Sequence, residues 1–344
     1  MFRAETGVVR AVKILPLTGL SSRLAVIAVL ALLLAAAGAV SLRFGVLEMS
    51  DAEFLEAWRA GNPVLVDIRL PRLLLGALVG AALAVSGAIL QTVLRNPLAS
   101  PGILGVSAGG GLAGVAALLL LPQYPFLPMP AAFCGALAAA LTVYLSAWRR
   151  GIEPVRLILA GVALAALLGA LSTLMLLLNS ERAAEIIGFT VGDLSGRGWK
   201  EFRLGAPWLA AGLLLSPFFS RSLNLLRVGD ETALSLGMPV ERVRFRLLAL
   251  ASLLASASVG VAGLLGFVGL IAPHCVRAVI GSDHRLLLPG SALAGALLTI
   301  GSDFAGRMIS PPLELPAGVV MALLGPVFFL GLLLRSGVWS GGDR

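Results

Sequence analysis

The sequence predicts an all-α membrane protein, a polytopic helical bundle of about ten transmembrane helices with both termini in the cytoplasm. Of the 344 residues, 58% are apolar and 13% are charged. Soluble domains have roughly 45–50% apolar and about 25% charged residues, so this composition is typical of a membrane protein. The apolar residues also form runs that approach or reach the roughly 20 residues needed to cross a bilayer.

Ten apolar segments can be drawn along the chain, with polar residues, prolines or glycines between most of them. They cover residues 21–41, 69–92, 103–121, 131–148, 155–178, 206–220, 244–262, 264–281, 286–305 and 316–335. We therefore expect a single transmembrane domain at 21–335, a cytoplasmic N-terminal tail at 1–20 and a C-terminal tail at 336–344.

The distribution of charge predicts the orientation. If the N-terminus is cytoplasmic, most of the 26 Lys and Arg residues fall in the inside regions, and most of the 18 acidic residues fall outside. This is the bias of the positive-inside rule. The same topology puts Arg69, Arg72 and Arg307 on the outer side. Because the basic residues flank apolar spans, they indicate topology and no nucleic-acid partner.

The predicted second span has the features of a helix in the crowded middle of a bundle. Arg69 and Arg72 share a helix face at its start, with Pro71 in the first turn. Small residues follow at helical spacing, which lets other helices approach closely; they are Gly76, Gly80, Ala84 and Gly87. The span ends in a turn that carries Arg95 and Asn96.

On the predicted cytoplasmic side, residues 225–246 have the pattern of two short amphipathic helices. Gly229 and Gly237 bracket the first helix, Asp230 suits its first turn, and Pro239 breaks it before the second. Short helices on the inner face suit docking to a partner protein. A solvated basic loop is the alternative interpretation.

Motifs for catalysis are weak or missing. The chain lacks the phosphate-loop pattern GxxxxGK[ST], and its two histidines match no common metal motif. A proton-driven carrier usually needs ionisable groups deep in the membrane, whereas Asp67 and Asp303 fall near span ends. We therefore expect no metal, no cofactor and no enzymatic activity in this chain, with the energy for any transport supplied by another subunit.

Eight motifs together resemble one protein family. In chain order they are RLPR, GAALAVSGAILQ, RNPLASPGILG, RLILAGVAL, GDETALSLGMP, GFVGLIAPH, DHRLLLPGSALAGA and PPLELPAGVV. They are similar to the permeases of bacterial type II ABC importers for iron–siderophore complexes, haem and vitamin B12, over roughly residues 65–340. The order and residues of these motifs are most similar to those of the ferric citrate and siderophore branch. The permease sequence nevertheless leaves the choice among these cargoes open.

This resemblance implies the partners and the location. Such permeases work in the bacterial inner membrane as homo- or heterodimers, in contact with membrane lipid. Two ABC ATPase subunits hydrolyse ATP with Mg²⁺ on the inside, and a periplasmic or lipoprotein substrate-binding protein delivers the cargo outside. The permease pair then moves the cargo inward by alternating access.

The resemblance also assigns residues to the two partner surfaces. Arginines at the positions of Arg69, Arg72 and Arg307 form salt bridges with glutamates of the binding protein, a geometry that suits the planar guanidinium group. Contact with lipid headgroups is the alternative for any one of them. The coupling region, at about 225–243, sits in a groove of the ATPase, and its matching residues are Gly229, Ala233, Leu236 and Gly237.

A third group follows from the same resemblance and belongs to the translocation path. The inner gate corresponds to Asn96, Leu98, Pro154 and Val155. Polar or small residues expected to line the path are Ser86, Gln91 and Ser107, and packing between spans would explain any one of these equally well.

Two other classes of function remain as alternatives. An ATP-independent secondary carrier or channel would transport without partner proteins, and the lack of deep carboxylates disfavours it. An intramembrane enzyme would need clustered acids or a metal site, for which only His274 and Asp303 are available.

Overall fold

The computed structural model describes most of the chain as a helical bundle. The described residues are 19–45, 50–124, 126–148 and 154–335. Within these ranges every regular element is a helix, as the sequence predicts. The predicted tails, 1–20 and 336–344, lie outside these ranges apart from Gly19 and Leu20.

Among the described residues, seven helical segments are long and apolar enough to cross a membrane. They are α1 (Leu20–Arg43), α3 (Leu70–Val93) with the π-helical turn η1 (Val64–Arg69) before it, α5 (Pro128–Ala147), α6 (Pro154–Leu178), α8 (Trp199–Leu215) with η4 (Ser216–Phe219) and α9 (Ser220–Val228) after it, α11 (Val240–Ala262) and α13 (His284–Ile309). The shorter apolar helices are α4 (Val106–Leu120), α12 (Val268–Ile280) and α14 (Ala317–Arg335). These helices fall on the ten apolar segments of the sequence.

The remaining helices are short and connect the long ones. They are α2 (Asp51–Arg59), η2 (Pro101–Leu104), η3 (Ser180–Arg182), α7 (Ala183–Val191) and α10 (Asp230–Ser235). The segment before α3 is thus partly helical, and a short helix with turns follows α6.

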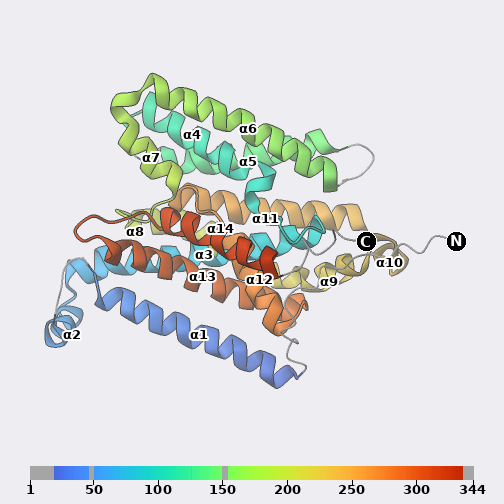
Figure 1. Cartoon of the computed structure of the whole chain (residues 1–344), viewed down its shortest axis with the longest axis horizontal. Coiled ribbons are helices and arrows are strands. Elements are labelled where there is room, and N and C mark those ends of the chain that lie inside the picture. Colours follow the sequence, from blue (N-terminus) through green and yellow to red (C-terminus); the bar gives the residue numbers. More distant parts are fainter. Residues whose placement is uncertain (1–18, 46–49, 125, 149–153, 336–344) are drawn as a thin grey trace.

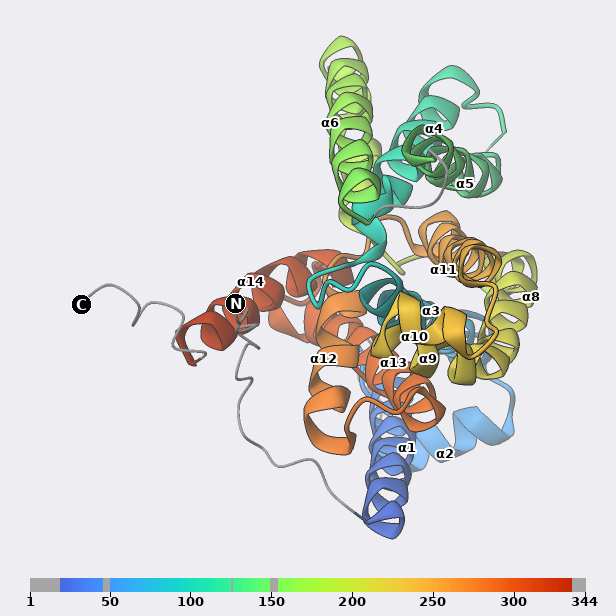
Figure 2. The same cartoon turned by 90° about the vertical axis from the view of Figure 1, so that its right-hand side faces the viewer.

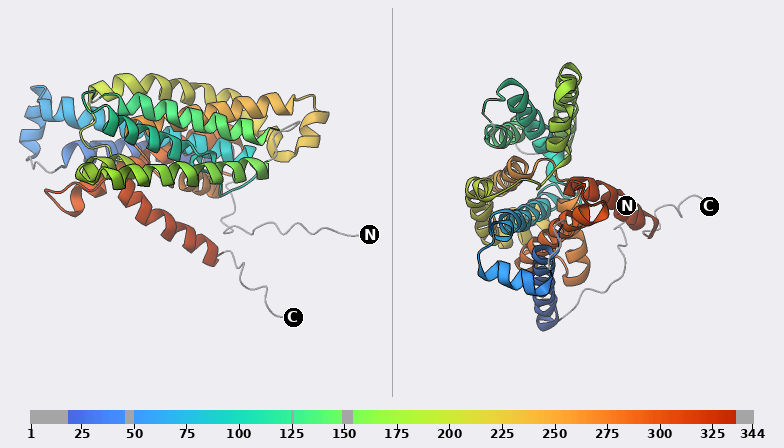
Figure 3. Two further views of the ribbon diagram at one scale, coloured as in Figure 1. Left: turned by 90° about the horizontal axis from the view of Figure 1, so that it is seen from above. Right: turned by 90° about the vertical axis from the view of Figure 1, so that its left-hand side faces the viewer.

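The long helices run back and forth along the long axis of the molecule, which gives the bundle two ends (Figure 1). We call the end with the start of α3 and the end of α13 the arginine end, and the opposite one the α10 end. Figure 2 looks onto the α10 end, and the right-hand view of Figure 3 looks onto the arginine end. Seen from above, α14 diverges from the other helices (Figure 3).

Helix α3 is the central element of the bundle. It packs against α8, α11, α12 and α13, and most of its side chains are buried. By contrast, α1 and α6 expose most of their apolar residues at the edges of the bundle, where α6 packs against α4 and α5 (Figure 2). In a membrane protein such outer faces meet lipid or another subunit.

Small residues allow this central packing, as the sequence predicts. A Cβ atom at Gly80 would collide with the backbone of Gly295 on α13, and one at Gly87 would collide with the backbone of Gly269 on α12. Glycine is therefore needed at both positions of α3 because neighbouring backbones touch it directly.

The coupling region differs from the prediction in one respect. Helix α10 lies between Gly229 and Gly237, as expected. The helix that follows Pro239 is not a second short one, because it continues into the apolar run 244–262 and forms the 23-residue α11. The two short helices are instead α9 and α10.

The glycine contacts predict a stability effect at α3. We expect Gly87→Ala to lower the thermal stability of the detergent-purified protein by about 1–3 kcal/mol, because the new methyl group must push α12 away. Gly169→Ala on α6 is the matched control, since no atom beyond the neighbouring helix backbone lies within 4 Å of its added Cβ. Equal melting temperatures for the two variants would contradict the close α3–α12 contact.

Candidate functional site

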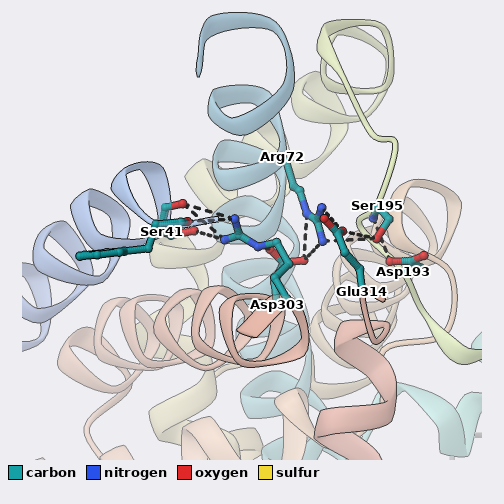
Figure 4. Close-up of polar contacts among 8 residues, drawn as sticks. Ser41, Arg72, Asp193, Ser195, Asp303 and Glu314 are labelled. Atoms are coloured by element: carbon teal, nitrogen blue, oxygen red, sulfur yellow. Dashed lines mark hydrogen bonds and ion pairs between the residues drawn. The ribbon is translucent and has the colours of Figure 1, made fainter. Parts of the chain in front are cut away.

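The first candidate site is a group of ion pairs at the arginine end, centred on Arg72 (Figure 4). Its Nε and Nη2 atoms donate to Oδ1 of Asp303 at 3.0 and 2.8 Å. Nη1 donates to Oε2 of Glu314 at 2.6 Å, and Nη2 reaches Oγ of Ser195 at 3.3 Å. Ser195 in turn donates to Glu314 at 3.2 Å. This arrangement joins α3, α13 and the two connecting segments that follow α7 and α13.

The other two predicted arginines lie beside Arg72. Arg307 is one helical turn after Asp303 on α13, and its Nε lies 3.3 Å from Oδ2 of that carboxylate. Its Nη2 donates to Oγ of Ser41 at 2.6 Å. Arg69 donates to the carbonyl oxygen of Leu42 at 2.7 Å. Asp303 is therefore shared by two arginines. Arg72 joins α3 to α13, whereas Arg307 on α13 and Arg69 in η1 both contact the last turn of α1.

Burial is the main difference from the sequence-based expectation. An exposed docking surface was expected, yet Arg69, Arg72 and Arg307 are only 8%, 8% and 4% exposed in the single chain. A buried guanidinium group needs counter-charges and hydrogen-bond acceptors. The chain provides them from its own carboxylates and carbonyl groups.

The two carboxylates of the cluster have different environments. The side chain of Asp303 is 7% exposed and that of Glu314 is 29% exposed. Burial by itself would raise the pKa of Glu314, but the hydrogen bond and positive charge of Arg72 outweigh it, so the pKa lies below its usual value. Glu314 is therefore ionised at neutral pH and is the more accessible of the two acids.

The second candidate site is α10 and the loops around it. Leu234 and Leu236 are exposed, so they are available to another protein. Ala233 is fully buried within this chain, which corrects the expectation that it lies against a partner. Gly229 and Gly237 have φ angles of 141° and 80°, so the backbone conformation itself explains these glycines.

The predicted gate residues lie at the α10 end of the bundle. Leu98 and Val155 are exposed and Ser107 is half-buried, whereas the side chain of Pro154 is outside the described part of the structure. Asn96 accepts a hydrogen bond from the Leu98 amide at 2.9 Å.

Ser86 and Gln91 require a correction. Both are buried within the chain, where the Ser86 hydroxyl donates to the carbonyl of Ala251 at 2.7 Å on α11. Gln91 points to the carbonyl of Gly269 on α12. Small polar side chains of α3 thus face neighbouring helices, because α3 occupies the middle of this chain.

Sequence reasoning also missed a buried polar cluster near the α10 end. The ring of His284 lies 2.8 Å from the Thr92 hydroxyl and 2.8 Å from Oδ1 of Asn224. Since Asn224 donates its amide to Asp283, its oxygen faces the ring, so Nδ1 of His284 carries the proton. The cluster ties α3, α9 and α13 together. No sequence motif indicates it, because the three partners are far apart in the chain.

None of these groups resembles a metal centre. Among the described residues, no set of three or more His, Cys, Asp or Glu side chains is placed to hold a metal ion. The chemistry that both ends support is ion pairing and protein contact.

Comparison with known proteins assigns the family. Residues 23–335 match the FecCD transport family. The chain belongs to this family. It is therefore a transport permease with several membrane-spanning helices, in agreement with the resemblance drawn from the motifs.

Named relatives match over most of their length. The Fe(3+) dicitrate transport system permease protein of Escherichia coli is 41% identical over 317 residues, covering 91% of this chain and 99% of the relative. The cobalamin import system permease protein of Halobacterium salinarum is 41% identical over 296 residues, covering 86% and 77%. A solved structure described as an inward-facing metal-chelate type ABC transporter superimposes with a TM-score of 0.81 at 27% identity, covering 91% and 99%.

The shared position of Asp303 leads to a stability prediction. We expect Asp303→Asn to destabilise the FecCD-family permease by about 3 kcal/mol, because it leaves two buried arginines without their common counter-ion. Asp51→Asn, at the exposed Arg43–Asp51 pair of the same end, should leave the melting temperature unchanged. Thermal unfolding in detergent distinguishes the two, and an equal effect of both changes would contradict the role given to Asp303.

Proposed function

We propose that this permease is the membrane subunit of an ATP-driven ABC importer that carries an iron(III) chelate of the citrate or siderophore type into the cytoplasm. The observation that carries this proposal is the 41% identity over 99% of a ferric dicitrate permease. Cobalamin and haem are the alternative cargoes, because permeases named for them match almost as well. In this proposal the chain itself hydrolyses no ATP and holds no cofactor.

The proposed topology has the arginine end outside and the α10 end in the cytoplasm of a bacterium, with the chain in the inner membrane. The charge bias of the sequence supports this orientation. The seven long helices together with α4, α12 and α14 would then cross the membrane ten times. An even number of crossings would leave both termini in the cytoplasm.

At the outer face, Arg69, Arg72 and Arg307 are proposed to bind carboxylates of a substrate-binding protein. Their burial means that docking requires an exchange of partners. Of the two acids that bind Arg72, Glu314 is the more accessible to solvent, so a carboxylate of the incoming protein would replace Glu314 on Arg72 while Asp303 stays in place. Glu314 thus keeps the Arg72 side chain in position, and it competes with the incoming carboxylate for that side chain.

At the inner face, α10 is proposed to contact an ABC ATPase subunit through Leu234 and Leu236. Two ATPase subunits and a second permease subunit, identical or related, complete the proposed complex. The exposed apolar face of α6, which begins near Val155, is available to lipid or to that second subunit. ATP-driven movement of α10 would then switch the permease pair between outward- and inward-open states.

Reconstitution tests this function directly. Proteoliposomes that contain the permease and its ATPase should accumulate radiolabelled ferric citrate when ATP is inside and the binding protein outside, and omission of any one component should stop uptake. Uptake of haemin or cobalamin in place of ferric citrate would change the cargo only. Uphill uptake by the permease alone would overturn the proposal.

The proposed exchange at Arg72 predicts that removing the internal competitor strengthens docking. Glu314→Gln should bind the substrate-binding protein about fivefold more tightly, equivalent to about 1 kcal/mol, because Arg72 loses one internal counter-charge. Glu56→Gln on α2 has the same change in net charge at the same end and should leave the affinity unchanged. Binding to the nanodisc-embedded complex by biolayer interferometry gives the measurement, and unchanged or weaker binding of the Glu314 variant would exclude the exchange.

A further inference from the structure

Asp230, the first residue of α10, connects three parts of the chain at the α10 end. Its Oδ1 atom lies 2.8 Å from Nη2 of Arg95, in the turn after α3. Both of its carboxylate oxygens accept from Nη2 of Arg244 on α11, at 3.0 Å each. Figure 2 looks onto this end and shows α10 in front of the bundle. The carboxylate therefore bridges α11 and the turn that carries the predicted gate residues.

The two links differ in burial. The Arg244 side chain is 4% exposed, and its Nη1 atom also lies 3.2 Å from Glu241, so α10 is held firmly against α11. The Arg95 side chain is 46% exposed, and an ion pair so open to water breaks and forms readily. The buried link makes α10 and α11 move together, and the exposed link joins them to the turn.

The turn after α3 is itself rigid. The Arg95 amide donates to the carbonyl of Thr92 at 3.3 Å, and the Asn96 amide donates to that of Gln91 at 3.1 Å, so the end of the helix is closed by its own hydrogen bonds. The Asn96 side chain then accepts from the Leu98 amide at 2.9 Å. A force on the Arg95 side chain would therefore move Asn96 and Leu98 as one body.

The backbone at Arg95 gives a reason why its side chain matters. Its φ angle is 48°, in the left-handed region, which is unfavourable for residues other than glycine. Glycine is the usual residue at this position of a helix end. Arginine therefore fits this turn less well than glycine would. Its long, charged side chain instead provides the contact with Asp230.

From these observations we infer that Arg95 and Asp230 form the link through which a displacement of α10 reaches the Asn96–Leu98 turn. Both are positioning residues, since they act through the gate. The inference rests on the proposed function, in which an ATPase moves α10. It adds the physical path between that helix and the gate, with Arg244 keeping Asp230 attached to α11.

The experiment measures the gate directly and does not depend on the cargo. In the full complex with ATPase and binding protein, the native Cys134 and Cys275 are replaced by Ala and Leu98 by Cys. We expect ATP plus vanadate to change the rate of maleimide labelling at this position by at least about threefold in the parent complex. In the Arg95→Gly background this nucleotide response should disappear.

Arg95→Gly also separates coupling from folding, because glycine adopts the required φ angle without strain. The melting temperature should therefore be at least as high as in the parent, and the same fraction of the permease should assemble with the ATPase. Arg95→Lys, which retains the positive charge, should restore most of the nucleotide response. Arg246→Gln is the matched control, since within the described residues this exposed arginine of α11 makes no ion pair, and it should respond as the parent does.

The outcomes distinguish this inference from the proposed function. A parent complex without any nucleotide response contradicts both. A normal response in the parent that persists in Arg95→Gly overturns the link and leaves the proposed function intact. Loss of the response in both Arg95→Gly and Arg95→Lys would also overturn it, because a positive charge paired with Asp230 would then not be what carries the response.

Discussion

The ion pair between Arg72 and Asp303 is the interaction on which the arginine end of this structure depends. It is almost completely buried, it joins α3 to α13, and Asp303 extends the contact to Arg307. A charge in such an environment is stable only with a counter-charge close by. Neither carboxylate nor guanidinium can therefore move without the other, so the pair holds α3 and α13 together at this end of the bundle.

The two ends of the bundle differ in how their buried arginines are paired with carboxylates. At the arginine end, Arg72 and Arg307 share the carboxylates of Asp303 and Glu314 in a largely buried cluster, in which Glu314 is the more exposed acid. At the α10 end, Asp230 has one buried partner and one exposed partner. The more exposed pairs, Arg72–Glu314 and Arg95–Asp230, are therefore the ones that can exchange partners most readily.

Glycine contacts inside the bundle complement these polar clusters. Gly80 and Gly87 bring α3 into backbone contact with α13 and α12. A shift of α3 would therefore displace both neighbouring helices. Because Arg72 lies in the first turn of α3 and Arg95 lies in the turn that follows it, the same helix connects the cluster at the arginine end with the turn at the α10 end. Rigid central packing of this kind allows a small displacement at one end to influence the other without deformation of the helix between them.

The sequence by itself determined the membrane class, the positions of the apolar helices, the short helix between Gly229 and Gly237, and the family, because apolar runs, turn residues and motifs are local properties. The tertiary structure decided how the polar residues are used. Ser86 and Gln91 face other helices, Ala233 is buried, and the three arginines of the arginine end are covered by partners within the chain. Asp303 was within reach of the i, i+4 rule from Arg307. Glu314 was not, since its contact with Arg72 spans 242 residues and exists only after α13 folds back onto α3.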